Sequence, residues 1–171
     1  MGNQLEMARA ILSTTAARWS SLTENVPLEV LARTPTPGEW STMDCLCHLL
    51  DAERWVFPVR VQALLSGKNF VAFDPDTQGT YYTTQNPEQL AKEFARLCKV
   101  NLIEFDQVTI EDLIRTSQQS ELGTVTLNEL VHEWAAHDLM HTVQAERAMM
   151  QPFIRASDPW RPHFHDHDVG K

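Results

Sequence analysis

The sequence predicts an all-α protein, folded as one four-helix bundle. Four amphipathic stretches keep the spacing of apolar residues that a helix with one buried face requires. Capping signals open three of them, and no segment has a convincing strand pattern. With 171 residues and a hydrophobic fraction of 43%, the chain can bury one core and fits a single domain.

The first predicted helix spans Gln4–Glu24, and Val26-Pro27 closes it. The second spans Ser41–Gly67 and opens at a capping box in which Asp44 replaces the usual glutamate. Proline lacks a backbone N–H, so we expect a kink or a break near Pro58.

The third predicted helix spans Asn86–Gln107, where asparagine is the cap and proline occupies the first turn. A short helical piece follows at Ile110–Arg115. The fourth helix begins at the full capping box Thr126-Leu127-Asn128-Glu129 and ends near Gln151-Pro152. We assign residues 1–155 to the bundle and 156–171 to a C-terminal tail.

The connection from Gly67 to Asn86 is long for a helical bundle. It either crosses one end of the bundle, which makes the second and third helices parallel, or forms a lid over a site. Its residues Thr80–Thr84 are of the β type but stand alone. We therefore predict no strand.

The charge of the chain excludes several function classes. The formal net charge is −9, and nucleic acids or anionic membranes require a basic surface instead.

No stretch approaches the ~20 apolar residues of a membrane span, and the N-terminus lacks a signal segment. Three cysteines are too few for a disulfide scaffold. We expect reduced thiols in a cytoplasmic protein.

Two histidines give the sharpest chemical signal. His137 and His141 lie four residues apart, so both imidazoles project from one helix face. That face also carries Leu130, Trp134 and Ala145, which places the pair toward the bundle interior. Buried imidazoles need partners, and a bound cation supplies one. The alternative is a helix with two hydrogen-bonded core histidines.

His48 is the best candidate for a third metal ligand, because it follows the cap of the second helix by two turns. Three histidines with an open fourth position are typical of catalytic zinc, and imidazole also suits nickel, copper and iron. Alone, His48 is also explained as a satisfied core histidine. Cys45 lies one turn earlier and either reaches the same ion or packs as a buried thiol.

Two carboxylates stand beside these ligands. Asp51 and Asp138 are each placed to orient an imidazole through its other ring nitrogen, and Asp51 also to accept a proton beside the metal. The alternative for both is a solvated or capping carboxylate. The tail sequence His163-Phe164-His165-Asp166-His167-Asp168 is either a solvated segment or an adventitious metal binder.

The order of these motifs resembles the DinB/YfiT-like superfamily. Pro37-Gly38-Glu39-Trp40-Ser41 leading to His48-Leu49-Leu50-Asp51-Ala52-Glu53 is similar to the start of its second helix. Gly123-Thr124-Val125-Thr126-Leu127 leading to His137-Asp138-Leu139-Met140-His141 and Gln144 is similar to its last long helix. The resemblance extends over nearly the whole chain, except the tail.

The resemblance implies an up-down-down-up bundle, with the long connection as the crossover, and a homodimer. It also implies a divalent metal, commonly nickel or zinc, bound by His48, His137 and His141. Characterised members of the superfamily include thiol-dependent isomerases and S-transferases. The resemblance therefore implies transfer of a low-molecular-weight thiol to an electrophilic small molecule.

Three other functions remain open from the residues alone. A metal-dependent hydrolase would use the same three histidines to bind a water-carrying ion. A non-catalytic stress-response protein would hold a structural metal in a closed four-ligand site. In a metal-free helical dimer the histidines would only pack.

Overall fold

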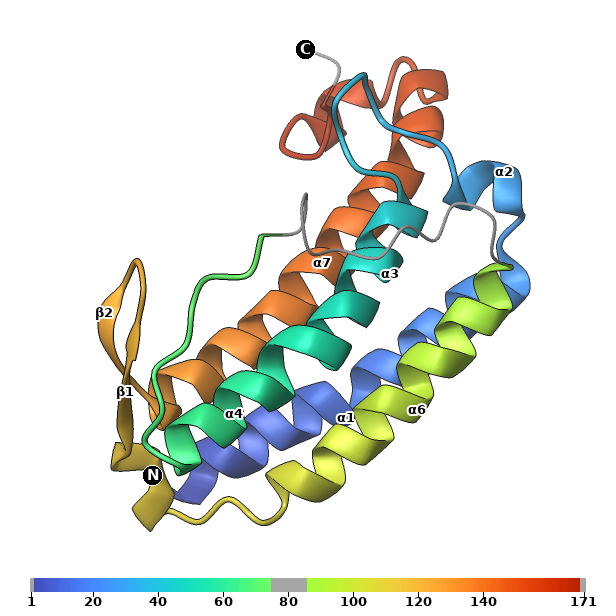
Figure 1. Ribbon diagram of the computed structural model, residues 1–171. Coiled ribbons are helices and arrows are strands. Elements are labelled where there is room, and N and C mark those ends of the chain that lie inside the picture. Colours follow the sequence, from blue (N-terminus) through green and yellow to red (C-terminus); the bar gives the residue numbers. More distant parts are fainter. Residues whose placement is uncertain (1, 75–85, 170–171) are drawn as a thin grey trace.

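The structure is a computed structural model that describes residues 2–74 and 86–169 (Figure 1). It is mostly helical, with four long helical segments. These are α1 (Gly2–Asn25), α3 (Thr42–Asp51) continued by α4 (Phe57–Leu65), α6 (Pro87–Phe105) and α7 (Leu127–Ala156). Helix α1 packs on α6 and α7, and α3 packs on the same two helices, so the segments surround a common core. A short helix, α2 (Leu28–Leu31), follows α1.

The buried faces of the four segments form two hydrophobic clusters. One is centred on Phe57, Phe105 and Trp134. The other is centred on Trp19, Leu49 and Phe94. Burying these side chains is the main force that holds helices of this length together, because isolated helices are only marginally stable in water.

The starts predicted for the second, third and fourth helices are confirmed, whereas the first helix begins at Gly2 instead of Gln4. The Ser41 hydroxyl accepts from the backbone N–H of Asp44, whose carboxylate accepts in turn from the N–H of Ser41. Thr126 and Glu129 form the same reciprocal box at the start of α7. The side chain of Asn86 caps α6 by accepting from the N–H of Glu88.

The break predicted near Pro58 takes the form of a π-helical turn, Ala52–Val56, between α3 and α4. The N–H of Phe57 donates to the carbonyl of Ala52, five residues back. A π turn inserts one residue into the helix and so rotates everything after it by about 100°. Pro58 then sits in the first turn of α4, where its missing N–H leaves no bond unmade.

Helix α7 continues through Pro152 to Ala156, so the predicted end at Gln151-Pro152 is wrong. The C-terminal segment holds the extra turn. The side-chain amide of Gln151 donates to the carbonyls of Arg147 and His167, and its oxygen accepts from the N–H of Val169. These bonds offset the carbonyl contact and the lost hydrogen bond that a proline imposes inside a helix.

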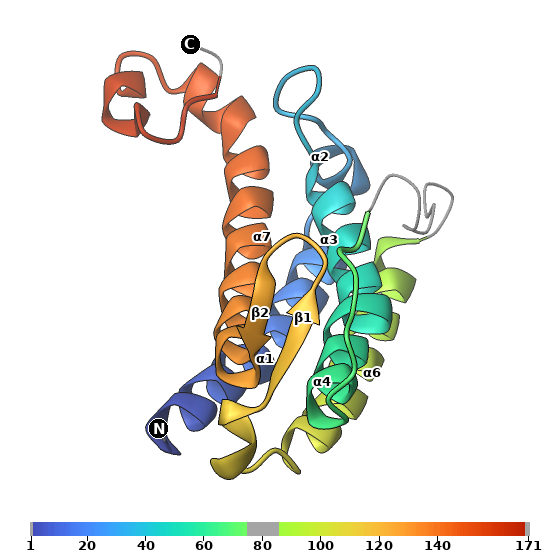
Figure 2. The same ribbon diagram turned by 60° about the vertical axis from the view of Figure 1, so that its left-hand side comes forward.

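The prediction of no strand is also wrong, because the chain contains a β-hairpin. Strands β1 (Thr116–Gln119) and β2 (Gly123–Thr126) pair antiparallel. A 3₁₀ turn, Glu111–Ile114, precedes the hairpin. Figure 2 shows it beside the face where α7 and α4 meet. Thr80–Thr84, the stretch of β-type residues, lies outside the described residues.

The C-terminal segment folds back at the end of α7 through a 3₁₀ turn, Arg161–Phe164 (Figure 2). An ion pair joins Arg161 Nε to the buried carboxylate of Asp168 at 2.7 Å. The three tail histidines remain exposed. Within the described residues, no helix is long and apolar enough to cross a membrane.

Candidate metal centre

Helices α3 and α7 bring three histidines together. The hydroxyl of Thr42, at the start of α3, donates to the carbonyl of Ala145 in the second half of α7 at 3.0 Å. Further along α3, His48 lies beside His137, which comes earlier in α7, so the two helices run antiparallel. His48 lies two turns after the α3 cap, where it faces His137 and His141 on α7.

The three imidazoles are close enough to share one ion. Nε2 of His48 lies 3.0 Å from Nε2 of His137. The ring centroids of His141 lie 4.5 Å from those of both other histidines, and the candidate ligand atoms all lie within 4.8 Å of one another. Two nitrogens bound tetrahedrally to one zinc ion at ~2.0–2.1 Å lie ~3.3 Å apart. The spacing of His48 and His137 is close to this value.

All three imidazoles are neutral at neutral pH. Burial, followed by the proximity of His141, lowers the pKa of His48 to about 4, against an opposing effect of Asp51. Burial and the two other histidines lower the pKa of His137 to about 3, and Arg60 contributes in the same direction. Burial also lowers the pKa of His141. Neutral imidazoles keep the lone pair that a metal ion requires.

His141 and His137 differ in whether the Nδ1 atom of the ring has a hydrogen-bond partner. Nδ1 of His141 lies 2.9 Å from Oε1 of Gln144, which accepts its proton and leaves Nε2 free to face the group. Nδ1 of His137 is buried and has no hydrogen-bond partner among the described residues. Nε2 of His48 and Nε2 of His137 are within hydrogen-bond distance of each other, but the buried Nδ1 of His137 remains unpartnered, and a group of imidazoles that is only partly satisfied in this way fits a cation.

Aromatic rings frame the group on two sides. Trp40 stacks on His141 with 5.5 Å between ring centroids and lies 5.0 Å from His48. Phe57 meets His137 edge-on at 5.2 Å and stacks on Trp134 at 5.0 Å. Trp40 therefore borders the three histidines. Trp134 packs in the hydrophobic core, and Trp55, which is 52% exposed, lies at the surface.

The two predicted carboxylates occupy different places. Asp51 is buried one turn after His48, and its charge acts on that imidazole. Asp138 is 1% exposed and points away from His137, because consecutive helix residues diverge by about 100°. Neither oxygen of Asp138 has a partner that meets the distance and angle of a hydrogen bond within the described ranges, although the nearby hydroxyl of Thr15 favours its charged form. The structure therefore does not show the bond to an imidazole predicted for Asp138.

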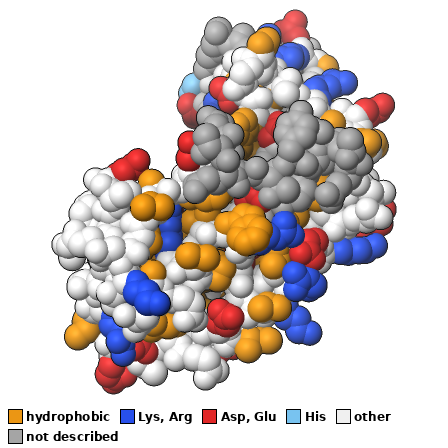
Figure 3. Space-filling model, in the orientation of Figure 1, with side chains coloured by type: hydrophobic (Ala, Val, Ile, Leu, Met, Phe, Trp, Pro, Cys, Tyr) orange, Lys and Arg blue, Asp and Glu red, His pale blue; other side chains and the backbone are white. Residues whose placement is uncertain are grey.

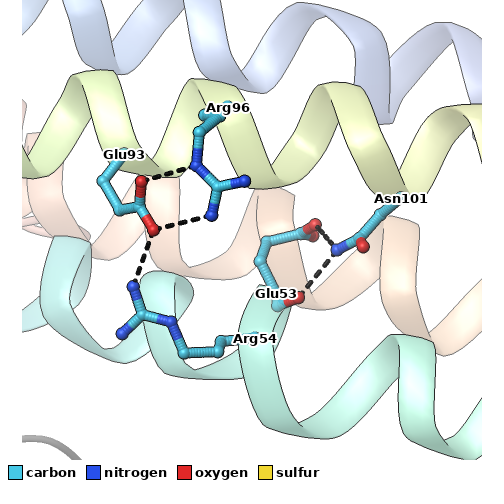
Figure 4. A network of polar contacts seen from close by, with 5 residues as sticks. All are labelled: Glu53, Arg54, Glu93, Arg96 and Asn101. Carbon is cyan, nitrogen blue, oxygen red and sulfur yellow. Dashed lines mark hydrogen bonds and ion pairs between the residues drawn. The ribbon is translucent and has the colours of Figure 1, made fainter.

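Asp138 instead faces a second buried carboxylate, Glu53, which sequence reasoning missed. Glu53 is in the π turn and accepts from Trp134 Nε1 at 2.6 Å. It also accepts from Asn101 Nδ2 at 2.7 Å (Figure 4). Burial and the charge of Glu53 raise the pKa of Asp138. Burial also raises the pKa of Glu53, and its hydrogen bonds oppose this. A glutamate between Asp51 and Arg54 in a predicted helix reads as a solvated residue and gives little sign of such a role.

The cysteines do not join the histidines. In the part of the chain that the structure describes, the group that converges on one point contains only His48, His137 and His141. Burial, with the charge of Asp44, raises the pKa of both Cys45 and Cys47 to about 12. Both thiols are therefore protonated at neutral pH.

A basic residue near the site was also missed. Arg60 of α4 has a side chain that is 17% exposed, and it lies 3.7 Å from the carboxylate of Glu133 on α7. Its guanidinium is 5.7 Å from the ring centroid of Phe70. The sequence places it in a helix but does not reveal the π turn that sets its direction.

No curated protein sequence matches the chain significantly. A solved structure described as "YfiT from Bacillus subtilis is a probable metal-dependent hydrolase with an unusual four-helix bundle topology" shares the fold, with a TM-score of 0.78. The match covers 90% of this chain and 89% of that one, at 14% sequence identity. A sequence model of the DinB superfamily matches residues 11–145. The chain therefore belongs to the DinB superfamily.

Proposed function

We propose that this protein is a divalent-metal-dependent enzyme in which His48, His137 and His141 hold the ion. The observation that carries the proposal is the convergence of three neutral imidazoles within 4.8 Å. Nickel and zinc are the ions that the family resemblance favours, and imidazole suits both. Three protein ligands leave a coordination position open for an exogenous group.

The nucleophile comes from outside the chain. The thiols of Cys45 and Cys47, both close to His48 in sequence, have pKa values of about 12 that keep them protonated, and Cys98 is buried. A divalent metal supplies acidity, since it lowers the pKa of a thiol or a water that coordinates it. We propose a low-molecular-weight thiol as the nucleophile and an electrophilic small molecule as its acceptor.

The surrounding residues have separate roles in this proposal. Trp40 and Phe57 flank the imidazoles and exclude water from them. Gln144 fixes the ring of His141. Asp51 is the proposed proton acceptor, because it is buried one turn from His48 and acts on it electrostatically.

Hydrolysis is the second candidate. It is supported by the fold shared with YfiT, which is described as a probable metal-dependent hydrolase. The same three histidines would serve, with water in place of the thiol. A metal-binding stress-response protein without turnover is the third alternative.

The remaining parts of the proposal follow the family resemblance. We propose a cytoplasmic homodimer with up-down-down-up helix order that acts on a small molecule and binds neither nucleic acid nor membrane. The net charge of −9 supports the last two points.

The test is a substrate screen on nickel- or zinc-loaded protein, with electrophiles and ester or amide substrates, each with and without an added thiol. Thiol transfer predicts turnover of electrophiles only when the thiol is present, and hydrolysis predicts turnover without it. His137→Ala is expected to lose metal and activity together. Full activity in a metal-free His137→Ala protein would contradict both reactions, and no turnover of any substrate favours the third alternative.

A further inference from the structure

Arg60 occupies a position that the proposed metal site leaves unexplained. In a continuous helix, Arg60 would point about 120° away from His48, because the two are twelve residues apart. The one-residue insertion of the π turn reduces this angle to about 20°. Arg60 therefore lies on the side of the α3–α4 segment that carries His48.

The position along α7 agrees with this geometry. Arg60 contacts Glu133, which lies one helical turn, about 5.4 Å, before His137. Phe57, one turn before Arg60, packs edge-on against His137. Arg60 and the three histidines thus lie at successive positions along the contact between the α3–α4 segment and α7.

The guanidinium is partly buried, and few of its donors have a protein partner. Its side chain is 17% exposed, and an arginine head offers five N–H donors. Among the described residues it makes no side-chain hydrogen bond, and its ion pair with Glu133 is long at 3.7 Å. Glu133 is itself 47% exposed, so water competes for that carboxylate.

Three other arginines of the chain have guanidinium groups that donate hydrogen bonds to carboxylates. Arg9 binds Asp106 through two nitrogens, and Arg96 binds Glu93 through two nitrogens at 2.8 and 2.9 Å (Figure 4). Arg54 donates to the same Glu93 at 2.9 Å. These three belong to the exposed or half-exposed surface, whereas Arg60 is the least exposed arginine among the ion pairs of the described residues.

The surroundings of Arg60 are apolar on one side. Phe70 lies under the guanidinium, and its backbone bonds to Gln118 and Ser120 of the hairpin region. The hairpin and the segment that carries Phe70 therefore hold a ring against Arg60. Figure 3 shows hydrophobic side chains gathered near the centre of the face seen in Figure 1, with basic side chains among them.

We propose that Arg60 binds a carboxylate of the substrate or of the thiol cofactor, about one helical turn away from the reacting centre at the three histidines. A carboxylate is the expected anion, because it matches a guanidinium through two parallel hydrogen bonds. A phosphate would need more positive charge than one arginine beside Glu133 supplies. The inference rests on the proposed metal-dependent function and adds the chemical class of its ligand.

The experiment uses cobalt(II)-loaded protein, because thiolate binding to cobalt produces a charge-transfer absorption band. Mercaptocarboxylates with two to five methylene groups are titrated beside mercaptoalcohols of matched length. A charge-assisted hydrogen-bonded pair predicts that, at the length that spans the site, the carboxylate binds about 10- to 100-fold more tightly. The same preference is expected to disappear in Arg60→Gln.

Two further variants control this result. Arg18→Gln removes one positive charge from the exposed side of α1 and is expected to keep the preference. Arg60→Lys keeps the charge but loses the two-pronged geometry, and it is expected to retain only part of the preference. Circular dichroism shows whether Arg60→Gln folds. If it does not, Arg60→Lys takes its place in the comparison with the wild type. Equal binding of carboxylates and alcohols by the wild type, or a preference that survives both Arg60 variants, would overturn the proposal.

If the proposed metal site is wrong, the same experiment gives a different result. If no probe of either class produces the band, the open metal position is contradicted rather than the role of Arg60. Butyrate is then titrated into metal-free ¹⁵N-labelled protein. The Arg60 Nε–H resonance is expected to shift on addition of butyrate but not of butanol. An unchanged resonance overturns the carboxylate site.

Discussion

At the scale of single residues, the candidate site is defined by which buried nitrogen and oxygen atoms have hydrogen-bond partners. His141 is oriented by Gln144, whereas His137 leaves a buried nitrogen without a partner among the described residues. Glu53 and Asp138 place two carboxylates in the core behind the histidines. Burial of such groups is costly unless they are hydrogen-bonded or protonated, so each should affect stability in a pH-dependent way.

Glu53 gives a prediction with a definite sign. Burial raises its pKa above the unfolded value of ~4.3, so the folded protein retains a proton that the unfolded chain releases. The stability that this proton contributes is fully present below the unfolded pKa and is lost as pH rises through the folded pKa. Glu53→Gln cannot ionise. We expect it to raise the melting temperature of metal-free protein relative to wild type by several degrees more at pH 8 than at pH 5.

Thermal unfolding followed by circular dichroism checks this prediction. Glu104→Gln, which removes an exposed carboxylate of α6, is the matched control and is expected to show little difference between the two pH values. A Glu53→Gln variant whose advantage over wild type is the same at both pH values would show that Glu53 is ionised in the fold throughout this range.

At the scale of elements, two local signals position the histidines. The capping boxes fix where α3 and α7 begin, and the π turn fixes which side of α4 meets α7. The caps were predictable because they depend on residues three apart in sequence. The π turn was predictable only as a disturbance near Pro58, because its form depends on tertiary packing of Glu53 and Phe57.

The cap of α7 yields the second prediction. Thr126→Ala removes the hydroxyl that accepts from Glu129, which should lower the free energy of unfolding by about 1 kcal/mol. His137 lies about three turns further along the helix, so metal content at saturating zinc should not change. Urea unfolding of metal-free protein and elemental analysis measure the two effects. Thr34→Ala, an exposed threonine outside the helices, is the control. Loss of metal in Thr126→Ala would contradict this expectation, because metal binding would then depend on the start of the helix.

The hairpin shows the limit of pattern analysis at this scale. Its strands are four residues long and read Thr-Ser-Gln-Gln and Gly-Thr-Val-Thr, without the alternation of apolar and polar residues that marks a half-buried strand. Gly123, with φ +78°, allows the reversal, but one glycine is a weak signal. Long-range contacts with Phe70 hold the hairpin in place, and no local rule predicts them.

At the scale of the whole molecule, the bundle brings together residues that are 89 and 93 positions apart in sequence, and this convergence makes the site. Spacing of four residues and an apolar seam were enough to predict that His137 and His141 share a face. The direction of Arg60 and the buried pair Glu53 and Asp138 were not predictable, because they depend on how three helices pack around the π turn. Membership of the DinB superfamily agrees with the bundle.

The account depends most directly on whether the three histidines bind a metal ion. The decisive measurement is elemental analysis of untagged protein beside His48→Ala and His137→Ala, with folding checked by circular dichroism. We expect about one transition-metal ion per chain in the wild type, and none in either variant while both remain folded. A wild type that stays metal-free after exposure to nickel and zinc, or variants that keep the metal, would contradict the account.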